Sequence, residues 1–242
     1  MIFGKGKFSW STALAELLII ALGVLVALGA NAWNDGRLAR VEEADYLSRI
    51  FSELQVDTAQ HTFILTRVEL KEASLRRIAA ALGSSDESFP DTASFLADLG
   101  DASDFGWNAG PLAGSATYED LRSSGKLGLI RDPALRMSII NYYGRAEAED
   151  RRITARRTEF PHIAYRIVPQ SGELLAGQFG GVELVAAENR ASVVAAVRAS
   201  ELSDHIIAET NRALFIRGVI TSLHGQALTL LGVISDYLVA TR

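Results

Sequence analysis

The most distinct hydrophobic pattern in this chain is an uncharged run near its start, from Leu17 to Trp33. The hydrocarbon core of a membrane is about 30 Å thick, and a helix needs about 20 residues to cross it. Residues 13–33 supply that length if Glu16 lies near the lipid headgroups. Three ionisable residues interrupt the other long apolar stretch, 213–240: Arg217, His224 and Asp236. That stretch predicts an amphipathic helix packed against protein, so we expect one membrane crossing.

The same region also has the features of a cleaved secretory signal. Lys5 and Lys7 give a basic start, residues 17–28 form an apolar stretch, and Ala30-Asn31-Ala32 fits an A-x-A cleavage pattern. Against cleavage, alanine-rich helical sequence continues through Ala32 with only two glycines as weak helix breakers. We interpret the segment as a retained anchor, with a secreted helical protein as the alternative.

Basic residues near the span bear on its orientation. Lys5 and Lys7 precede the span, and Arg37, Arg40 and Arg49 follow it, so counting cations does not decide. A short basic N-terminus before a long C-terminal domain more often stays in the cytoplasm while the domain is exported. We therefore expect a short basic leader (1–12), a transmembrane helix (13–33) and a helical extracytoplasmic domain (34–242). The absence of cysteine excludes disulfides and thiolate metal sites.

A helical periodicity follows the anchor over five heptads. Apolar residues, with one histidine, fall seven apart at Leu47, Leu54, His61, Val68, Leu75 and Leu82. We expect the anchor to continue into this helix, with a bend at Asn34-Asp35-Gly36 as an option, and to end at Gly83. Between these heptad positions, polar residues replace apolar ones at Asp57/Thr58 and at Lys71/Glu72. A coiled-coil dimer would instead use a single asparagine to fix its register. The stripe therefore predicts a bundle within one chain.

Further helices are predicted from their capping residues. Asp132-Pro133 opens a helix that should run past Tyr142 and Tyr143 towards Phe160. Ser200 or Ser203 should open the last helix, which has a long apolar side. Asp91 can cap residues 92–99, and Thr117 with Asp120 resembles a capping box of a helix that ends at Gly125.

Two glycine-rich stretches are expected to be loops, Gly100–Ala116 and Pro169–Gly181. The first contains Phe105, Trp107 and Asn108, a candidate partner-binding loop, although the favoured interpretation is that its aromatic residues fill the end of the bundle. No useful period-2 run indicates a sheet. The predicted fold is all-α: an N-terminal transmembrane helix continuing into a long-helix bundle, with short accessory helices and glycine-rich loops.

Charge and motif patterns narrow the function. The net charge is −5 and the arginines of residues 145–157 alternate with acidic residues, so no nucleic-acid partner is expected. The four histidines are widely spaced, and no metal-binding, phosphate-loop or nucleophile-elbow motif occurs. His61, on the apolar stripe, is interpreted as a core histidine that has its hydrogen bond. We therefore expect no enzymatic activity and no cofactor.

Two stretches resemble a bacterial family of uncharacterised single-span membrane proteins with the pattern E-(hydrophobic)-LG-(hydrophobic)-AL-x-x-N-x-WN. The first runs from Ala15 to Leu28 and continues with Asn31-Ala32-Trp33-Asn34, Arg37, Tyr46-Leu47, Leu54 and Asp57. The second covers Tyr118 to Ile130, with Leu135 and Tyr142-Tyr143. The resemblance covers about a quarter of the chain. It implies a retained anchor in the bacterial inner membrane and a helical domain in the periplasm, and it adds no activity.

The anchor carries residues suited to contact another membrane helix. Glu16 could lie at the headgroups or make a polar contact with a neighbouring helix. Gly23 and Ala27 allow close approach, and the Asn31 amide can bond across an interface. We therefore expect lipid together with a membrane-protein partner or further copies of the chain. The favoured function is a membrane-anchored accessory or structural subunit, and the alternative is a periplasmic sensory or small-ligand-binding module.

Overall fold

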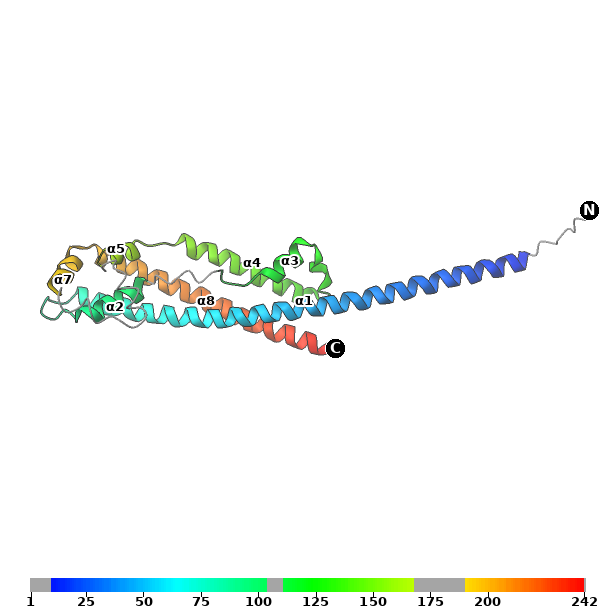
Figure 1. Cartoon of the computed structure of the whole chain (residues 1–242), viewed down its shortest axis with the longest axis horizontal. Coiled ribbons are helices and arrows are strands. Elements are labelled where there is room, and N and C mark those ends of the chain that lie inside the picture. The colour runs from blue at the N-terminus through cyan, green and yellow to red at the C-terminus, as the bar shows by residue number, and fades with distance from the viewer. Residues whose placement is uncertain (1–9, 104–110, 168–189, 242) are drawn as a thin grey trace, which may run out of the picture.

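The chain is all-helical in the part that the computed structural model describes, which is residues 10–103, 111–167 and 190–241. This confirms the all-α prediction at that level. The elements are α1 (Trp10–Leu82), α2 (Thr92–Ser103), α3 (Ala116–Ser123), the 3-10 helix η1 (Lys126–Leu129), α4 (Pro133–Ala155), α5 (Phe160–Ile167), α7 (Arg190–Ala199) and α8 (Leu202–Ala240). Figure 1 shows an elongated bundle from which the N-terminal part of α1 projects.

Helix α1 is one unbroken helix of 73 residues. It passes through Asn34-Asp35-Gly36 without interruption and ends at Leu82, just before the predicted stop at Gly83. Its C-terminal part lies along α8, which runs in the opposite direction (Figure 1). Helix α4 packs on α8, and α2 packs on α1 near its C-terminal end.

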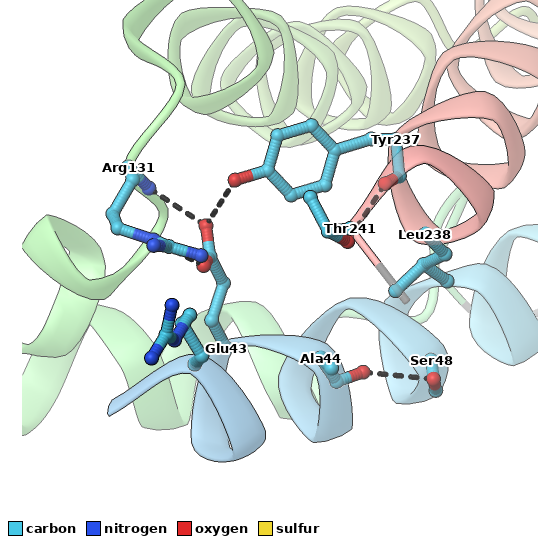
Figure 2. A pocket seen from close by; sticks show the side chains of 8 residues that line it. Glu43, Ala44, Ser48, Arg131, Tyr237, Leu238 and Thr241 are labelled. Atoms are coloured by element: carbon cyan, nitrogen blue, oxygen red, sulfur yellow. Dashed lines mark hydrogen bonds and ion pairs between the residues drawn. The ribbon is translucent and has the colours of Figure 1, made fainter. Parts of the chain in front are cut away.

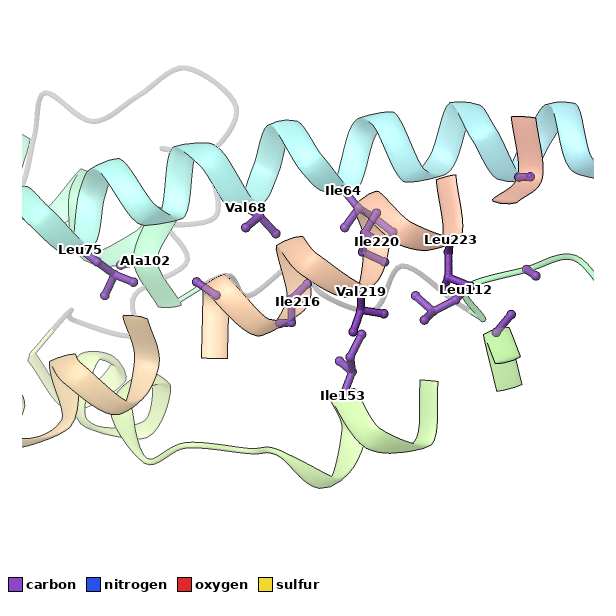
Figure 3. Close-up of a cluster of buried hydrophobic side chains, with 14 of the residues drawn as sticks. Ile64, Val68, Leu75, Ala102, Leu112, Ile153, Ile216, Val219, Ile220 and Leu223 are labelled. Atoms are coloured by element: carbon purple, nitrogen blue, oxygen red, sulfur yellow. The ribbon is translucent and has the colours of Figure 1, made fainter. Parts of the chain in front are cut away.

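The predicted stripe of α1 forms the centre of the core. Its positions from Leu47 to Leu75 are 0–1% exposed, and they pack within the chain, as the bundle prediction required. Figure 3 shows Ile64 and Val68 of α1 facing Ile220 and neighbouring residues of α8. On the other side of α8, Val219 lies against α4. The polar residues that interrupt the stripe are also buried: Asp57, Lys71 and Glu72.

Two predicted helix caps are confirmed. The Asp91 side chain accepts hydrogen bonds from the backbone N–H groups of Ala93 and Ser94, both at 3.0 Å. The Asp132 side chain accepts from Ala134 at 2.7 Å and Leu135 at 3.2 Å, with proline at the first helical position. Each carboxylate satisfies two backbone donors that the first helical turn leaves unpaired.

Other predicted boundaries were wrong. Helix α4 ends at Ala155, and Phe160 begins α5 instead of ending the earlier helix. Helix α2 continues through Gly100 to Ser103 because Leu99 and Ala102 bury its apolar side. The predicted loop therefore starts later, and Phe105, Trp107 and Asn108 lie outside the described residues, as does the stretch Pro169–Gly181.

The starts of α3 and α8 also differ from the predicted ones. Thr117 lies inside α3 and is not its cap, because Glu53 of α1 accepts hydrogen bonds from both its N–H and its hydroxyl. Helix α8 begins at Leu202, whose N–H donates to the Ser200 hydroxyl at 3.4 Å. Gly125 follows α3 with a φ of 72°, a left-handed conformation that glycine adopts without strain.

Candidate functional site

The N-terminal part of α1 exposes its apolar side chains on all sides. Leu17, Ile19, Ile20 and Leu25 are each 64–70% exposed, and Trp33 is 66% exposed. In the described part of the chain, two helices are long and apolar enough to cross a membrane. None of the most apolar 18-residue window of α1 is buried, whereas 33% of the corresponding window of α8 is. An exposed apolar surface of this extent on an isolated helix needs an apolar environment.

The predicted contact residues lie on this exposed part of α1. Gly23, Ala27 and Asn31 are exposed, and a Cβ added at Gly23 would meet no atom within 4 Å. Glu16 also belongs to α1, but its side chain lies outside the described residues. The bundle therefore leaves the Gly23–Asn31 face open to a neighbour.

Beyond the anchor, α1 places one ionisable side chain in the core every fourteen residues, at Glu43, Asp57 and Lys71. These three side chains are at most 2% exposed, and isoleucines Ile50, Ile64 and Ile78 alternate with them at the same heptad position. A buried charge is costly unless it is paired and hydrogen-bonded. Each of the three finds its partner on a different part of the chain.

Glu43 lies closest to the anchor and joins three elements. Its Oε1 accepts hydrogen bonds from the Arg131 N–H at 2.8 Å and the Tyr237 hydroxyl at 2.7 Å, and its Oε2 accepts from Arg131 Nε at 2.7 Å. Figure 2 shows the Glu43 carboxylate between these two residues. Burial, followed by the Glu43 carboxylate, raises the pKa of Tyr237. A cavity of about 130 Å³ adjoins the cluster, lined by Arg40, Glu43, Ala44, Ser48, Arg131, Tyr237, Leu238 and Thr241.

The second cluster combines two carboxylates with two tyrosines of α4. Asp57 accepts from the Tyr142 hydroxyl at 2.8 Å and from the Gly114 N–H at 2.7 Å. Glu53 accepts from the Tyr143 hydroxyl at 3.3 Å as well as from α3. Burial is the main cause of the raised pKa values of Asp57, Tyr142 and Tyr143. Both phenols therefore stay protonated and act as hydrogen-bond donors.

The third cluster is a buried ion pair between Lys71 of α1 and Glu209 of α8, with side-chain exposures of 2% and 0%. Glu209 also accepts a hydrogen bond from the Thr158 hydroxyl and lies 3.4 Å from Arg212 Nη1. Next to it, Glu72 pairs with Arg217 at 3.1 Å. These contacts fix the register of α1 against α8 and of the α4–α5 connection against both.

His61 lies in the core between the second and third clusters. Its Nε2 is 2.7 Å from the Leu112 carbonyl oxygen, which can only accept, so Nε2 carries the proton. The ring meets that of His224 edge to face, with centroids 6.2 Å apart. Burial lowers the pKa of His61, and this effect exceeds the opposing effect of the Leu112 carbonyl. Nε2 of His61 thus has the hydrogen bond expected of a core histidine, while its Nδ1 is buried without a hydrogen-bond partner among the described residues.

The first two clusters share one kind of contact, a carboxylate of α1 that accepts hydrogen bonds from other elements. The three acidic side chains Glu43, Glu53 and Asp57 accept hydrogen bonds at both of their oxygens from other parts of the fold. In the described ranges, no group of three or more histidine, aspartate or glutamate residues is placed to hold a metal ion. These hydrogen bonds and ion pairs hold α4, α8 and the loops before α3 and α4 in place against α1.

Neither a family model, nor a curated protein, nor a solved structure matches the chain. The resemblance to single-span membrane proteins thus stays a prediction from the residues that carry it. The polar clusters were largely missed by sequence reasoning, since their partners lie 85 or more positions apart in three of the contacts. The one available signal was the regular fourteen-residue spacing of ionisable residues along α1.

Proposed function

We propose that this protein is a membrane-anchored accessory or structural subunit without enzymatic activity. Its helical domain and anchor would bind a membrane complex or further copies of the chain. The observation that carries the proposal is the form of α1: one helix runs from an apolar segment exposed on all sides into the centre of a bundle. The same helix would therefore set the position of the domain relative to the membrane.

The polar clusters support this role. Buried ion pairs and hydrogen-bonded carboxylates favour one alignment of α1, α4 and α8 over shifted ones. A domain held at a defined height above the membrane suits a subunit that positions partners. In our proposal the N-terminus is cytoplasmic, and the domain lies in the periplasm of a bacterium.

The cavity beside Glu43 favours a second candidate function, a small-ligand-binding module. At about 130 Å³ it is smaller than the several hundred Å³ typical of ligand pockets. Its Glu43 carboxylate is already bound by Arg131 and Tyr237. We therefore rank this function second.

Purification of the tagged full-length protein from its native membranes in a mild detergent tests the proposal. We expect a membrane protein or further copies of the chain to co-purify. Ala27→Leu fills the small-residue face and should reduce the co-purified material, while Leu25→Ala, about 200° away around the helix, should not. A lone monomer would contradict the proposal, and a retained small molecule found by mass spectrometry would promote the second candidate.

A further inference from the structure

Outside the predicted span, α1 carries a second apolar stripe, on the side that faces away from the bundle. Val56, Phe63 and Leu70 are 66%, 63% and 37% exposed, and they recur every seven residues. Small or hydroxyl residues lie between them on the same side, at Ser52, Ala59, Thr66 and Ala73. We call the three large residues the outer stripe. Its spacing is that of a helix seam that contacts another helix.

Three hydroxyl groups beside the outer stripe are already paired within α1. The hydroxyl of Ser52 donates to the Ser48 carbonyl at 3.1 Å, that of Thr62 to Thr58 at 2.9 Å, and that of Thr66 to Thr62 at 3.1 Å. Hydroxyls that bond to the preceding turn of their own helix leave little unpaired hydrogen-bonding capacity. Covering these three hydroxyls with another helix therefore costs little desolvation.

The outer stripe lies in phase with the predicted contact face of the anchor. Asn31 precedes Val56 by 25 residues, about seven turns at 3.6 residues per turn. Ala27 precedes Phe63 by 36 residues, about ten turns, and Leu38, 59% exposed, precedes Val56 by 18 residues, about five turns. Because α1 is unbroken, both surfaces look toward the same side of the molecule.

A neighbour that covers both surfaces must be a long rod. From Ala27 to Leu70 the helix extends about 65 Å at 1.5 Å per residue, beginning inside the predicted membrane. The α1 helix of a second copy has this length and the same stripe. Anchored in the same membrane, it would run parallel at the same height, so Val56 would meet Val56 and Phe63 would meet Phe63.

Charged residues also lie on this side of α1, nearer to the predicted span. Asp45 and Arg49 form an ion pair at 3.2 Å, and both side chains are about half exposed or more. Arg49 precedes Val56 by seven residues, so in two parallel helices it lies opposite Arg49 of the other copy. Asp45 of each copy, one turn away, can offset this repulsion by reaching Arg49 of the other. At the flanking heptad position, Gln55 and Thr62 are uncharged and Glu69 is charged and exposed.

From this we infer that two copies of the chain pair in parallel through the outer stripe of α1, from the anchor to Leu70. The inference rests on the proposed function and names a second copy as the partner.

Cysteine crosslinking in native membranes tests it, because the full-length chain has no cysteine of its own. Val56→Cys and Phe63→Cys should give disulfide-linked dimers on mild oxidation, at roughly ten times the yield of Leu228→Cys, since parallel pairing brings each residue close to its own copy. Leu228 is a matched control, apolar and 50% exposed on α8. Equal yields at all three positions would overturn the inference.

Three further variants separate failure of this inference from failure of the proposed function. A dimer through Asn31→Cys with none at residues 56 and 63 would keep association through the anchor and overturn the pairing of outer stripes. Phe63→Glu should convert the detergent-solubilised dimer into a monomer by light scattering with helix content unchanged, whereas Leu228→Glu should leave it dimeric. A Phe63→Glu protein that stays dimeric would also overturn the inference.

Discussion

Glu43, Asp57 and Lys71 show how single residues organise this bundle. Each lies at a heptad position where an apolar residue would pack, and each binds a partner from another element instead. Removing one member of such a pair leaves a buried charge without its partner, which is more costly than losing an exposed ion pair. The polar residues of α1 therefore select one packing among several that the apolar stripe alone would allow.

His61 gives a test at the residue scale. Burial lowers its pKa from the ordinary value of 6.5, so the unfolded chain takes up a proton that the folded chain resists. Stability should therefore fall as the pH drops below about 6.5 and be retained above it. His61→Gln can still donate to the Leu112 carbonyl but does not titrate, so its stability should fall less over the same range.

The measurement is urea unfolding of both proteins between pH 8 and 5. Asp57 has a raised pKa, so its own contribution to stability changes with pH in the opposite direction. The informative quantity is thus the difference between wild type and His61→Gln at each pH. Parallel curves for the two proteins would show that His61 does not titrate as described.

The same residues show where sequence reasoning fails. Asp57 and Lys71 interrupt an apolar stripe, and a stripe alone gives no reason to bury them. Their partners, Tyr142 and Glu209, are 85 and 138 positions away, and only the folded arrangement brings them into contact. His61, in contrast, could be predicted as a core histidine, because it occupies a stripe position itself.

At the scale of elements, helices with local signals were predicted well. Asp91 and Asp132 act as caps because a carboxylate at that position meets the free N–H groups of the next turn, whatever lies further away. Thr117 failed as a cap because Glu53, on another helix, takes both of its donors. Local chemistry thus predicts a helix start only where no distant group competes for the same atoms.

Two glycines give an element-scale prediction. Gly225 lies inside α8 with nothing within 4 Å of an added Cβ, so Gly225→Ala should stabilise the protein by about 0.5–1 kcal/mol through helix propensity. Gly125→Ala should destabilise it by about 1 kcal/mol, because the φ of 72° strains any residue with a Cβ.

Chemical unfolding of the two variants measures both effects. A destabilising Gly225→Ala would contradict the open surroundings of this position.

At the scale of the whole molecule, α1 combines an exposed apolar segment, our proposed anchor, with the central helix of the core. Its apolar N-terminal part has no contact that would cover it, while its C-terminal part is covered by α8 and α2. The sequence pattern was sufficient to predict this continuity, since both halves have clear hydrophobic signals. It was not sufficient to place a short helix such as α3, which is held by the Glu53 carboxylate of α1.

The claim that α1 is a retained membrane anchor is tested most directly by the intact mass of the protein recovered from carbonate-washed native membranes. We predict the full chain of 26.1 kDa in the membrane pellet, with residues 1–32 still attached. A soluble chain that begins at residue 33 would contradict the claim, since it would identify Ala30-Asn31-Ala32 as a cleavage site.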